Sequence, residues 1–500
     1  MRRTLTAATL AGCLVAGACG TTDPGLTAGR SDGIVEVSIP DPGGTMPPPS
    51  SIEPNPNNAF IDFGDNKEPQ AYDDFLQAAL ADVQDYWRAT YPEVYGTPYV
   101  ELAGGIWASY PGREGNPIPA APDGCFGDPA ETYIAEQNAF YCSFGDYMAY
   151  DDFNLIPKLV NDYGQSAVGV VFAHEFGHAI QARVDVLPQS PVVFREQQAD
   201  CFAGSWSAHV ARGESTTLTF ADDDIRAGLS AMVAVKDPTI VFDENGNPTG
   251  LDVFEGNAHG TAFDRVGAFE NGFLGGAVAC MAMETDPLPL LNLQFDYEAG
   301  TDIESQLDLP YDADAGGVSL EQNLVDDLTR FWVGAVADFG PPAIESYPHD
   351  GPYPECSDVD EASFPFGAFY CPSTNTLLYD DGYARALYRT YGDFSVGYII
   401  SNAWSDAAQT QLGSSLTGEK RTLINECLTG AWTKDIIPSG DPEQTFTISP
   451  GDLDEAVETA LILGTEDIGD NQMGSAFEKI EFFRAGVLGG VTECNNRITG

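Results

Sequence analysis

Apolar and polar residues divide this chain into segments of different kinds. Residues 4–18 are uncharged and follow two arginines, a stretch too short to span a bilayer but typical of a secretory signal. Residues 20–65 are rich in Pro, Gly, Asn and Asp, which predicts an extended tether. Residues 166–183 have the pattern of a buried helix, and two amphipathic helical patterns end at 86–87 and 331–332. No later stretch is apolar for long enough to cross a membrane.

Four blocks of sequence occur twice, in the same order, along the chain. Self-similarity of this kind indicates repeated structural units. We therefore expect two homologous modules, the second a copy of the first. The paired blocks are Ala139–Cys142 with Ala368–Cys371, 201–206 with 427–432, 262–280 with 476–494 and, more weakly, 86–87 with 331–332.

A chain of 500 residues is too long for one compact core and suggests two or three domains. The repeat and the clusters of Pro, Gly and Asp give the boundaries. We expect a signal peptide at 1–18, a tether at 19–65, a first module at 66–290, a linker at 291–314 and a second module at 315–500.

The signal ends in small residues followed by a cysteine, the sequence AGAC that closes at Cys19. This box resembles the cleavage site of bacterial lipoproteins, so Cys19 would become the lipidated first residue of the mature chain. The sequence LAGC at Cys13 also fits, but it leaves an apolar region of only about eight or nine residues. A plain cleaved signal is the other alternative. In each case we expect an extracytoplasmic protein, and lipidation would anchor it to the cell membrane.

Export makes the other eight cysteines candidates for disulfide bonds. Eight cysteines allow about a hundred pairings, so their spacing alone does not choose among them. The repeat favours pairing within each module, and shuffled or partly reduced cysteines are the alternative. The expected pairs are Cys125 with Cys142, Cys201 with Cys280, Cys356 with Cys371, and Cys427 with Cys494.

Charge narrows the range of partners. Lysine and arginine total 22 against 76 aspartates and glutamates, and the formal net charge is −54. This balance argues against nucleic acid as a partner, because phosphate binding requires a positive field. Hydrophobic residues make up 43% of the chain, a usual share for a globular protein, so a core can form.

Within the predicted helix at 166–183, residues 174–178 read HEFGH. Residues four apart lie on one helical face, so His174 and His178 can present two imidazoles to one ion. Glu175 then lies beside the metal, where a carboxylate can take a proton from metal-bound water. The motif is specific, because roughly 0.01 accidental matches are expected in a chain with so few histidines. A helix with two hydrogen-bonded histidines and a solvated glutamate is the alternative.

A catalytic zinc site usually has a third protein ligand. The metzincin extension is excluded, because Gln181 and Val184 stand where it requires glycine and histidine. Glu196 and Asp200 are four apart and so share one helical face. One can bind the metal while the other accepts the free ring N–H of a histidine ligand. We assign Glu196 as the ligand and Asp200 as the histidine's partner, and the reverse assignment is the main alternative.

Together these motifs resemble the bacterial "putative neutral zinc metallopeptidases", a gluzincin-type group. The resemblance covers most of the first module and implies an α+β, zincin-like fold. Ala179 stands where the group commonly has histidine, and Ser143 where it commonly has proline, but neither position is a predicted ligand. The matching residues are 174–178, Glu196 with Asp200, Cys201, Gly204 and Trp206, 259–261 with Arg265, and 140–142.

The resemblance also implies the roles of the site residues. Zn²⁺ would be bound by His174, His178 and Glu196, with Glu175 as the general base. The function expected is therefore a zinc-dependent peptidase that hydrolyses peptide or protein substrates at the outer face of the membrane, where Glu175 activates a zinc-bound water. His259 either hydrogen-bonds the oxyanion or has a structural role. A non-catalytic binding or scaffold lipoprotein with the same fold is the rival interpretation.

The second module keeps the scaffold residues but lacks the chemistry. Every predicted ligand and the base are replaced, whereas Cys427, Gly430, Trp432 and Cys494 remain. We therefore expect a degenerate copy that packs on, shapes or regulates the first module. Asn402, Ala403 and Asp406 stand where His174, Glu175 and His178 are expected to lie, and Thr422 and Glu426 stand against Glu196 and Asp200.

Overall fold

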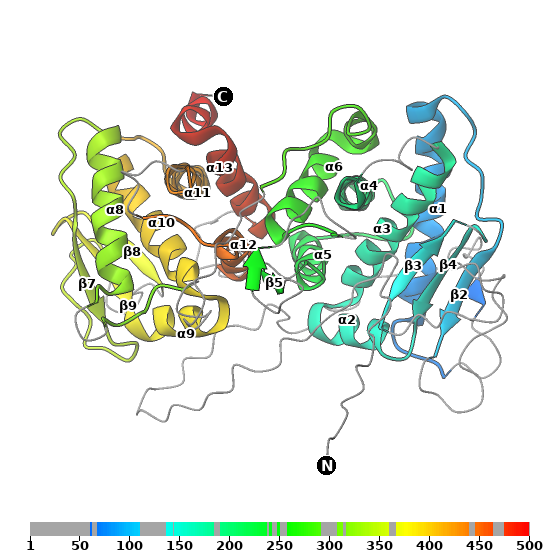
Figure 1. Ribbon diagram of the computed structural model, residues 1–500, viewed down its shortest axis with the longest axis horizontal. Coiled ribbons are helices and arrows are strands. Elements are labelled where there is room, and N and C mark those ends of the chain that lie inside the picture. Colours follow the sequence, from blue (N-terminus) through cyan, green and yellow to red (C-terminus); the bar gives the residue numbers. More distant parts are fainter. Residues whose placement is uncertain are drawn as a thin grey trace, which may run out of the picture.

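The protein has a helix-rich α+β fold with small sheets in the computed structural model (Figure 1). The predicted signal peptide, Cys13, Cys19, Cys125 and nearly all of the tether lie outside the described residues. No helix within the described ranges combines the length and apolar character that a bilayer crossing requires. The structure describes residues 61–62, 68–110, 137–143, 145–184, 191–237, 240–242, 248–250, 258–291, 308–313, 317–359, 367–439, 446–463 and 475–499.

The first half of the described chain packs its helices beside a four-stranded sheet of order β1-β2-β4-β3. Neighbouring strands are parallel except β3, which runs antiparallel to β4 at the sheet edge and contacts α3. The elements are β1 Ile61–Asp62, α1 Asp73–Tyr95, β2 Gly105–Ser109, β3 Ala139–Cys142, β4 Tyr147–Asp151, α2 Leu155–Tyr163, α3 Gln165–Val184, α4 Val192–Ala211, α5 Asp222–Ala234, β5 Ile240–Phe242, β6 Pro248–Gly250 and α6 Ala262–Ala282.

The second half has a three-stranded sheet of order β7-β9-β8, in which β7 and β9 are parallel and β8 is antiparallel to β9. Strands β2, β4 and β3 of the first half have the same order and directions. The sequence of helices and strands from α8 onward also follows that from α1 to α6, apart from the small β5–β6 pair. The elements are α8 Leu320–Ala335, β7 Ala343–Tyr347, β8 Ala368–Cys371, β9 Thr376–Asp380, α9 Asp381–Tyr391, α10 Asp393–Gln411, α11 Gly418–Asp435, α12 Asp452–Leu463 and α13 Ala476–Thr499.

Each half contains a buried tryptophan that donates a hydrogen bond to an aspartate on its first helix. The indole of Trp206 donates to Asp82 at 2.8 Å, and that of Trp432 donates to Asp327 at 2.8 Å. Disulfide bonds join the expected cysteines, and Cys142 is also disulfide-bonded although its expected partner lies outside the described residues. The described bonds are Cys201–Cys280, Cys356–Cys371 and Cys427–Cys494.

Glycine allows the central helices of each half to pack with their backbones in close contact. A Cβ atom on Gly204 of α4 would lie 2.0 Å from the carbonyl oxygen of Phe269 on α6. A Cβ atom on Gly430 of α11 would lie 2.0 Å from the carbonyl oxygen of Phe483 on α13. No side chain fits at such a distance, so both positions require glycine.

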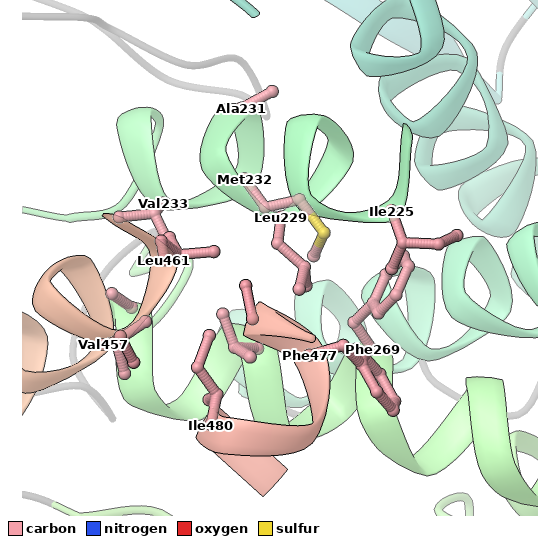
Figure 2. Close-up of a cluster of buried hydrophobic side chains, with 14 of the residues drawn as sticks. Ile225, Leu229, Ala231, Met232, Val233, Phe269, Val457, Leu461, Phe477 and Ile480 are labelled. Carbon is pink, nitrogen blue, oxygen red and sulfur yellow. The ribbon is translucent and has the colours of Figure 1, made fainter. Parts of the chain in front are cut away.

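The two halves meet through α5 and α6 of the first and α12 and α13 of the second (Figure 1). Figure 2 shows apolar side chains from all four helices in one cluster, with Val233 of α5 beside Leu461 of α12. These residues belong to one buried core that continues through both halves. Burial of this apolar surface is the main force that holds the halves together.

We predict that Gly204→Ala strongly destabilises the protein, by about 3 kcal/mol or more, because the added methyl group overlaps a backbone carbonyl that belongs to a packed helix. The matched control is Gly334→Ala on α8, where nothing lies within 4 Å of the added atom. There we expect a small gain of about 0.5–1 kcal/mol, since alanine favours helix over glycine. Urea unfolding of both variants measures the effect, and equal stabilities would contradict the prediction.

Candidate metal centre

Helices α3 and α4 carry the predicted metal ligands and cross at very short range. A Cβ atom on Gly177 of α3 would lie 2.8 Å from the Cα atom of Ala199 on α4, a distance that only glycine permits. His178 follows Gly177 directly, and Glu196 lies one turn before Ala199. The crossing therefore brings these two side chains to the same place.

Three possible ligand atoms face one another at this crossing. The Nε2 atoms of His174 and His178 are 3.2 Å apart. Oε2 of Glu196 lies 3.3 Å from Nε2 of His174 and 3.4 Å from Nε2 of His178. Two ligands of a tetrahedral zinc ion, each at about 2.0–2.1 Å from the metal, lie about 3.3 Å apart. The three side chains, grouped as a candidate metal site, therefore have the spacing that one such ion requires.

The tautomer of His174 is set by Asp200. Nδ1 of His174 lies 2.7 Å from Oδ1 of Asp200, which is completely buried. A carboxylate only accepts hydrogen bonds, so Nδ1 carries the proton and donates it. In the neutral ring, Nε2 then has a free lone pair on the side of His178 and Glu196.

His178 is oriented in the same way by Gln181, a contact that our sequence analysis missed. Nδ1 of His178 lies 3.0 Å from Oε1 of Gln181. The Gln181 amide nitrogen donates to the carbonyl of Arg195 and to Gln198, which identifies Oε1 as the acceptor. The spacing of three residues along one helix is the signal that could have revealed this pair.

Asp200 is itself held by Arg265 from α6. The guanidinium donates from Nε to Oδ2 and from Nη2 to Oδ1, each at 2.9 Å. Its third contact, from Nη1 to the carbonyl of Val235, is also 2.9 Å. Burial alone would raise the pKa of the Asp200 carboxyl, but Arg265 and His174 hold it below its usual value. Asp200 therefore stays a carboxylate that orients His174, and Glu196 is the residue that faces both imidazoles.

The acidic groups around the two imidazoles make the site attractive to positive charge. Burial alone would lower the pKa of His174, but Asp200, Glu196 and Glu175 raise it to about 10. Burial likewise opposes the charged form of His178, yet the Glu196 carboxylate raises its pKa. Burial would raise the pKa of Glu196, but the two histidines hold it well below its usual value. Protons and a metal ion therefore compete for the same nitrogen atoms.

Glu175 lies in the pocket without belonging to the triangle of ligand atoms. It is only 8% exposed, and burial raises the pKa of its carboxyl. The backbone N–H of Tyr141 on the edge strand β3 donates to Oε2 at 3.1 Å. The sheet edge thus holds Oε2 of Glu175, while Oε1 takes no part in this hydrogen bond.

His259 lies on the pocket wall and is paired with Asp237. Its Nδ1 atom is 3.2 Å from Oδ1 of Asp237, whose other oxygen accepts from the backbone N–H groups of His259 and Gly260. Asp237 thereby fixes both the ring and the loop before α6. Sequence spacing gave no sign of this carboxylate.

The pocket that contains these groups has an empty volume of about 590 Å³, counting the solvent at its mouth. Apolar side chains from α2, α3 and α5 form most of the remaining wall, which suits an uncharged part of a ligand. The lining residues outside the polar group are Asn138, Ala139, Leu155, Leu159, Val171, Met232 and Val235.

The second half has a different arrangement at the positions that the repeat sets against the ligands. Asp406 forms an ion pair with Arg421, with Nε 2.6 Å from Oδ1. Glu426 is buried, accepts a hydrogen bond from the hydroxyl of Tyr398, and has a pKa that burial raises to about 7. Within the described part of this half, no pair of histidines faces a carboxylate.

Comparison with known proteins agrees with this geometry. The family described as "Putative neutral zinc metallopeptidase" matches residues 132–283. An uncharacterized protein of Mycobacterium tuberculosis is 34% identical over 160 residues, which cover 28% of this chain and 52% of that protein. The uncharacterized protein YpfJ of Escherichia coli K12 is 32% identical over 153 residues, or 27% and 50% of the two chains. No solved structure gives a significant match.

This chain therefore spans about half the length of the curated relatives it matches. The matched segment contains both histidines, Glu175, Glu196 and Asp200, and the family suggests zinc as the metal. The resemblance seen in the sequence motifs is thus confirmed, because residues 132–283 match the family described as "Putative neutral zinc metallopeptidase".

Proposed function

We propose that the first half is a zinc-dependent peptidase whose metal is held by His174, His178 and Glu196. The observation that carries this proposal is the triangle of ligand atoms with edges of 3.2–3.4 Å. Both imidazoles donate their Nδ1 protons elsewhere, so in the neutral rings three lone-pair atoms face one another. Only a cation makes such an arrangement favourable.

When bound, zinc would polarise the scissile carbonyl and lower the pKa of a water in its open coordination position towards about 7. Glu175 would accept the proton of the attacking water and pass it to the leaving amine. Its raised pKa suits this role, because a general base works best when its pKa is near the operating pH. The N–H of Tyr141 keeps the carboxylate in place during both transfers.

The pocket wall supplies the remaining functions. Asp237 holds the ring of His259, and we assign this imidazole to hydrogen-bond the oxyanion. The apolar side chains of Leu155, Leu159 and Met232 would bind an uncharged side chain of the peptide. The formal charge of −54 favours neutral or basic substrates over acidic ones.

We further propose that the second half is a degenerate copy of the peptidase module. The matching order of elements, the same strand directions and the two tryptophan–aspartate bonds support this assignment. In the copy, the Asp406–Arg421 ion pair balances charge internally. A metal is therefore not required there.

We predict that the purified wild-type protein binds one zinc ion and cleaves peptides, and that Glu175→Gln retains the zinc but loses activity. A loss of about 10²–10⁴-fold in kcat is expected from removal of a general base. Zinc content and turnover of a mixed peptide library are the measurements. The matched control is Glu426→Gln, at the position in the second half that the repeat sets against Asp200, which should change neither.

Stoichiometric zinc without cleavage of any library peptide would instead support the scaffold interpretation.

We also predict that zinc stabilises the protein more strongly as the pH rises from about 6 to 8.5. The pKa of His174 in the metal-free fold is about 10, above its ordinary value of about 6.5. The stability contributed by its protonation is present below pH 6.5 and is lost as the pH rises through 10. Metal replaces those protons, so its advantage grows with pH. Thermal unfolding with and without zinc measures the difference, and a constant difference would contradict the prediction.

We propose, finally, that the protein is a lipoprotein at the outer face of the cell membrane, anchored through Cys19. Cys19→Ala is expected to move the protein from the membrane fraction to the soluble fraction after export. Mass spectrometry of the N-terminal peptide identifies the modified residue. Lipid on Cys13, or a free N-terminus without lipid, would refute the assignment to Cys19.

A further inference from the structure

Helix α12 of the second half binds a segment that forms part of the pocket wall. Lys236 lies between Val235, which lines the pocket, and Asp237, which holds His259. Its ammonium group is 2.7 Å from Glu458 and 3.4 Å from Asp454, both on α12. The side chain of Asp454 is almost completely buried. The second half therefore holds the wall at a point between two of its functional residues.

The second half also binds the start of α6, at Phe263. Asp454 accepts a hydrogen bond from the backbone N–H of Phe263 at 3.2 Å. Arg484 of α13 donates to the carbonyl oxygen of Phe263, and its guanidinium lies 4.0 Å from the centre of the phenyl ring. Arg484 also forms a buried ion pair with Glu270, with Nε 3.1 Å from Oε2. Phe263 is thus held through its amide, its carbonyl and its ring.

These contacts are linked to His174 through Arg265 and Asp200. Phe263 lies two residues before Arg265 on the same helix. Arg265 binds Asp200 through two hydrogen bonds, and Asp200 orients His174. A shift at the beginning of α6 would therefore be transmitted through two charged side chains to one imidazole.

The apolar contact between the halves includes the pocket itself. Met232 lines the pocket and belongs to the cluster in Figure 2, which also contains Phe477 and Ile480 of α13. At Gly267, a Cβ atom would lie 1.6 Å from Nη2 of Arg484, so this glycine leaves room for the guanidinium. The first half is therefore shaped to accept the charged residues of the second.

Simple adhesion between the halves does not require these buried charges. An apolar interface is usually as stable as one with buried ion pairs, because burying charged groups costs solvation. What charged and hydrogen-bonded contacts add is a fixed geometry. Here the charged contacts fix residues 235–237 and the start of α6, and both of these segments reach the proposed metal site.

We propose that the second half is a structural part of the active site, with Asp454 and Arg484 as positioning residues for the wall formed by Val235, His259 and Arg265. This inference rests on the proposed peptidase function, because only then would the positioned wall belong to an active site. The contacts themselves predict changes in metal binding and in local dynamics, which are measurable whether or not the protein cleaves peptides.

The test compares Asp454→Ala with Asp327→Ala in the full-length protein. Asp327 is also buried in the second half, but it bonds Trp432 and Arg330 there. We expect both variants to lower the melting temperature. Only Asp454→Ala should weaken zinc binding, by roughly tenfold as for other residues that support a ligand, and alter the visible spectrum of the cobalt-substituted protein. Asp454→Asn keeps an acceptor for the Phe263 amide and should recover most of the affinity.

Amide hydrogen exchange of residues 258–265 in the metal-free protein gives a readout that needs neither zinc nor activity. Faster exchange in Asp454→Ala than in Asp327→Ala is expected. If Asp454→Ala does not fold, Glu458→Gln is the milder variant, since its side chain is partly exposed. Equal zinc affinity, cobalt spectra and exchange in the two variants would overturn the proposal. Failure of wild-type peptidase activity alone would refute the proposed function and leave this test valid.

Discussion

The whole site depends on three potential ligand atoms held close together where α3 and α4 cross. Nε2 of His174, Nε2 of His178 and Oε2 of Glu196 would repel one another unless a cation lay among them. Asp200 and Gln181 fix the arrangement by accepting the only ring protons of the neutral imidazoles. The close crossing of α3 and α4 and the bonds to Arg265 serve to keep these atoms in place.

Much of this site followed from local spacing in the sequence. The interval of four residues between His174 and His178, and between Glu196 and Asp200, gave each pair a common helical face. Spacing did not decide which acid faces both imidazoles. The structure places Glu196 against both Nε2 atoms and Asp200 at the far side of one ring. Asp237 was missed because its contact with His259 depends on tertiary packing across 22 residues.

The outline of the fold was predictable because helical patterns and cysteine positions can be recognised from short stretches of the sequence. The order of elements in the second half follows that of the first. The contact between the halves was not predictable. Phe263 and Arg484 lie in one pair of repeated blocks, but the repeat does not indicate that they touch, and Lys236 and Asp454 belong to no motif. Only three-dimensional structure brings such residues together, so their pattern could not be recognised in advance.

The ion pair between Asp406 and Arg421 has a consequence for how this molecule responds to its surroundings. In the second half, the positive partner of Asp406 is part of the polypeptide, whereas the proposed zinc site of the first half would take its positive charge from solution. A shortage of divalent ions would then affect the crossing of α3 and α4 but not the corresponding crossing of α10 and α11. At the Asp406–Arg421 position, folding alone completes the charge balance. The proposed zinc site would reach its balance only after folding, when an ion binds.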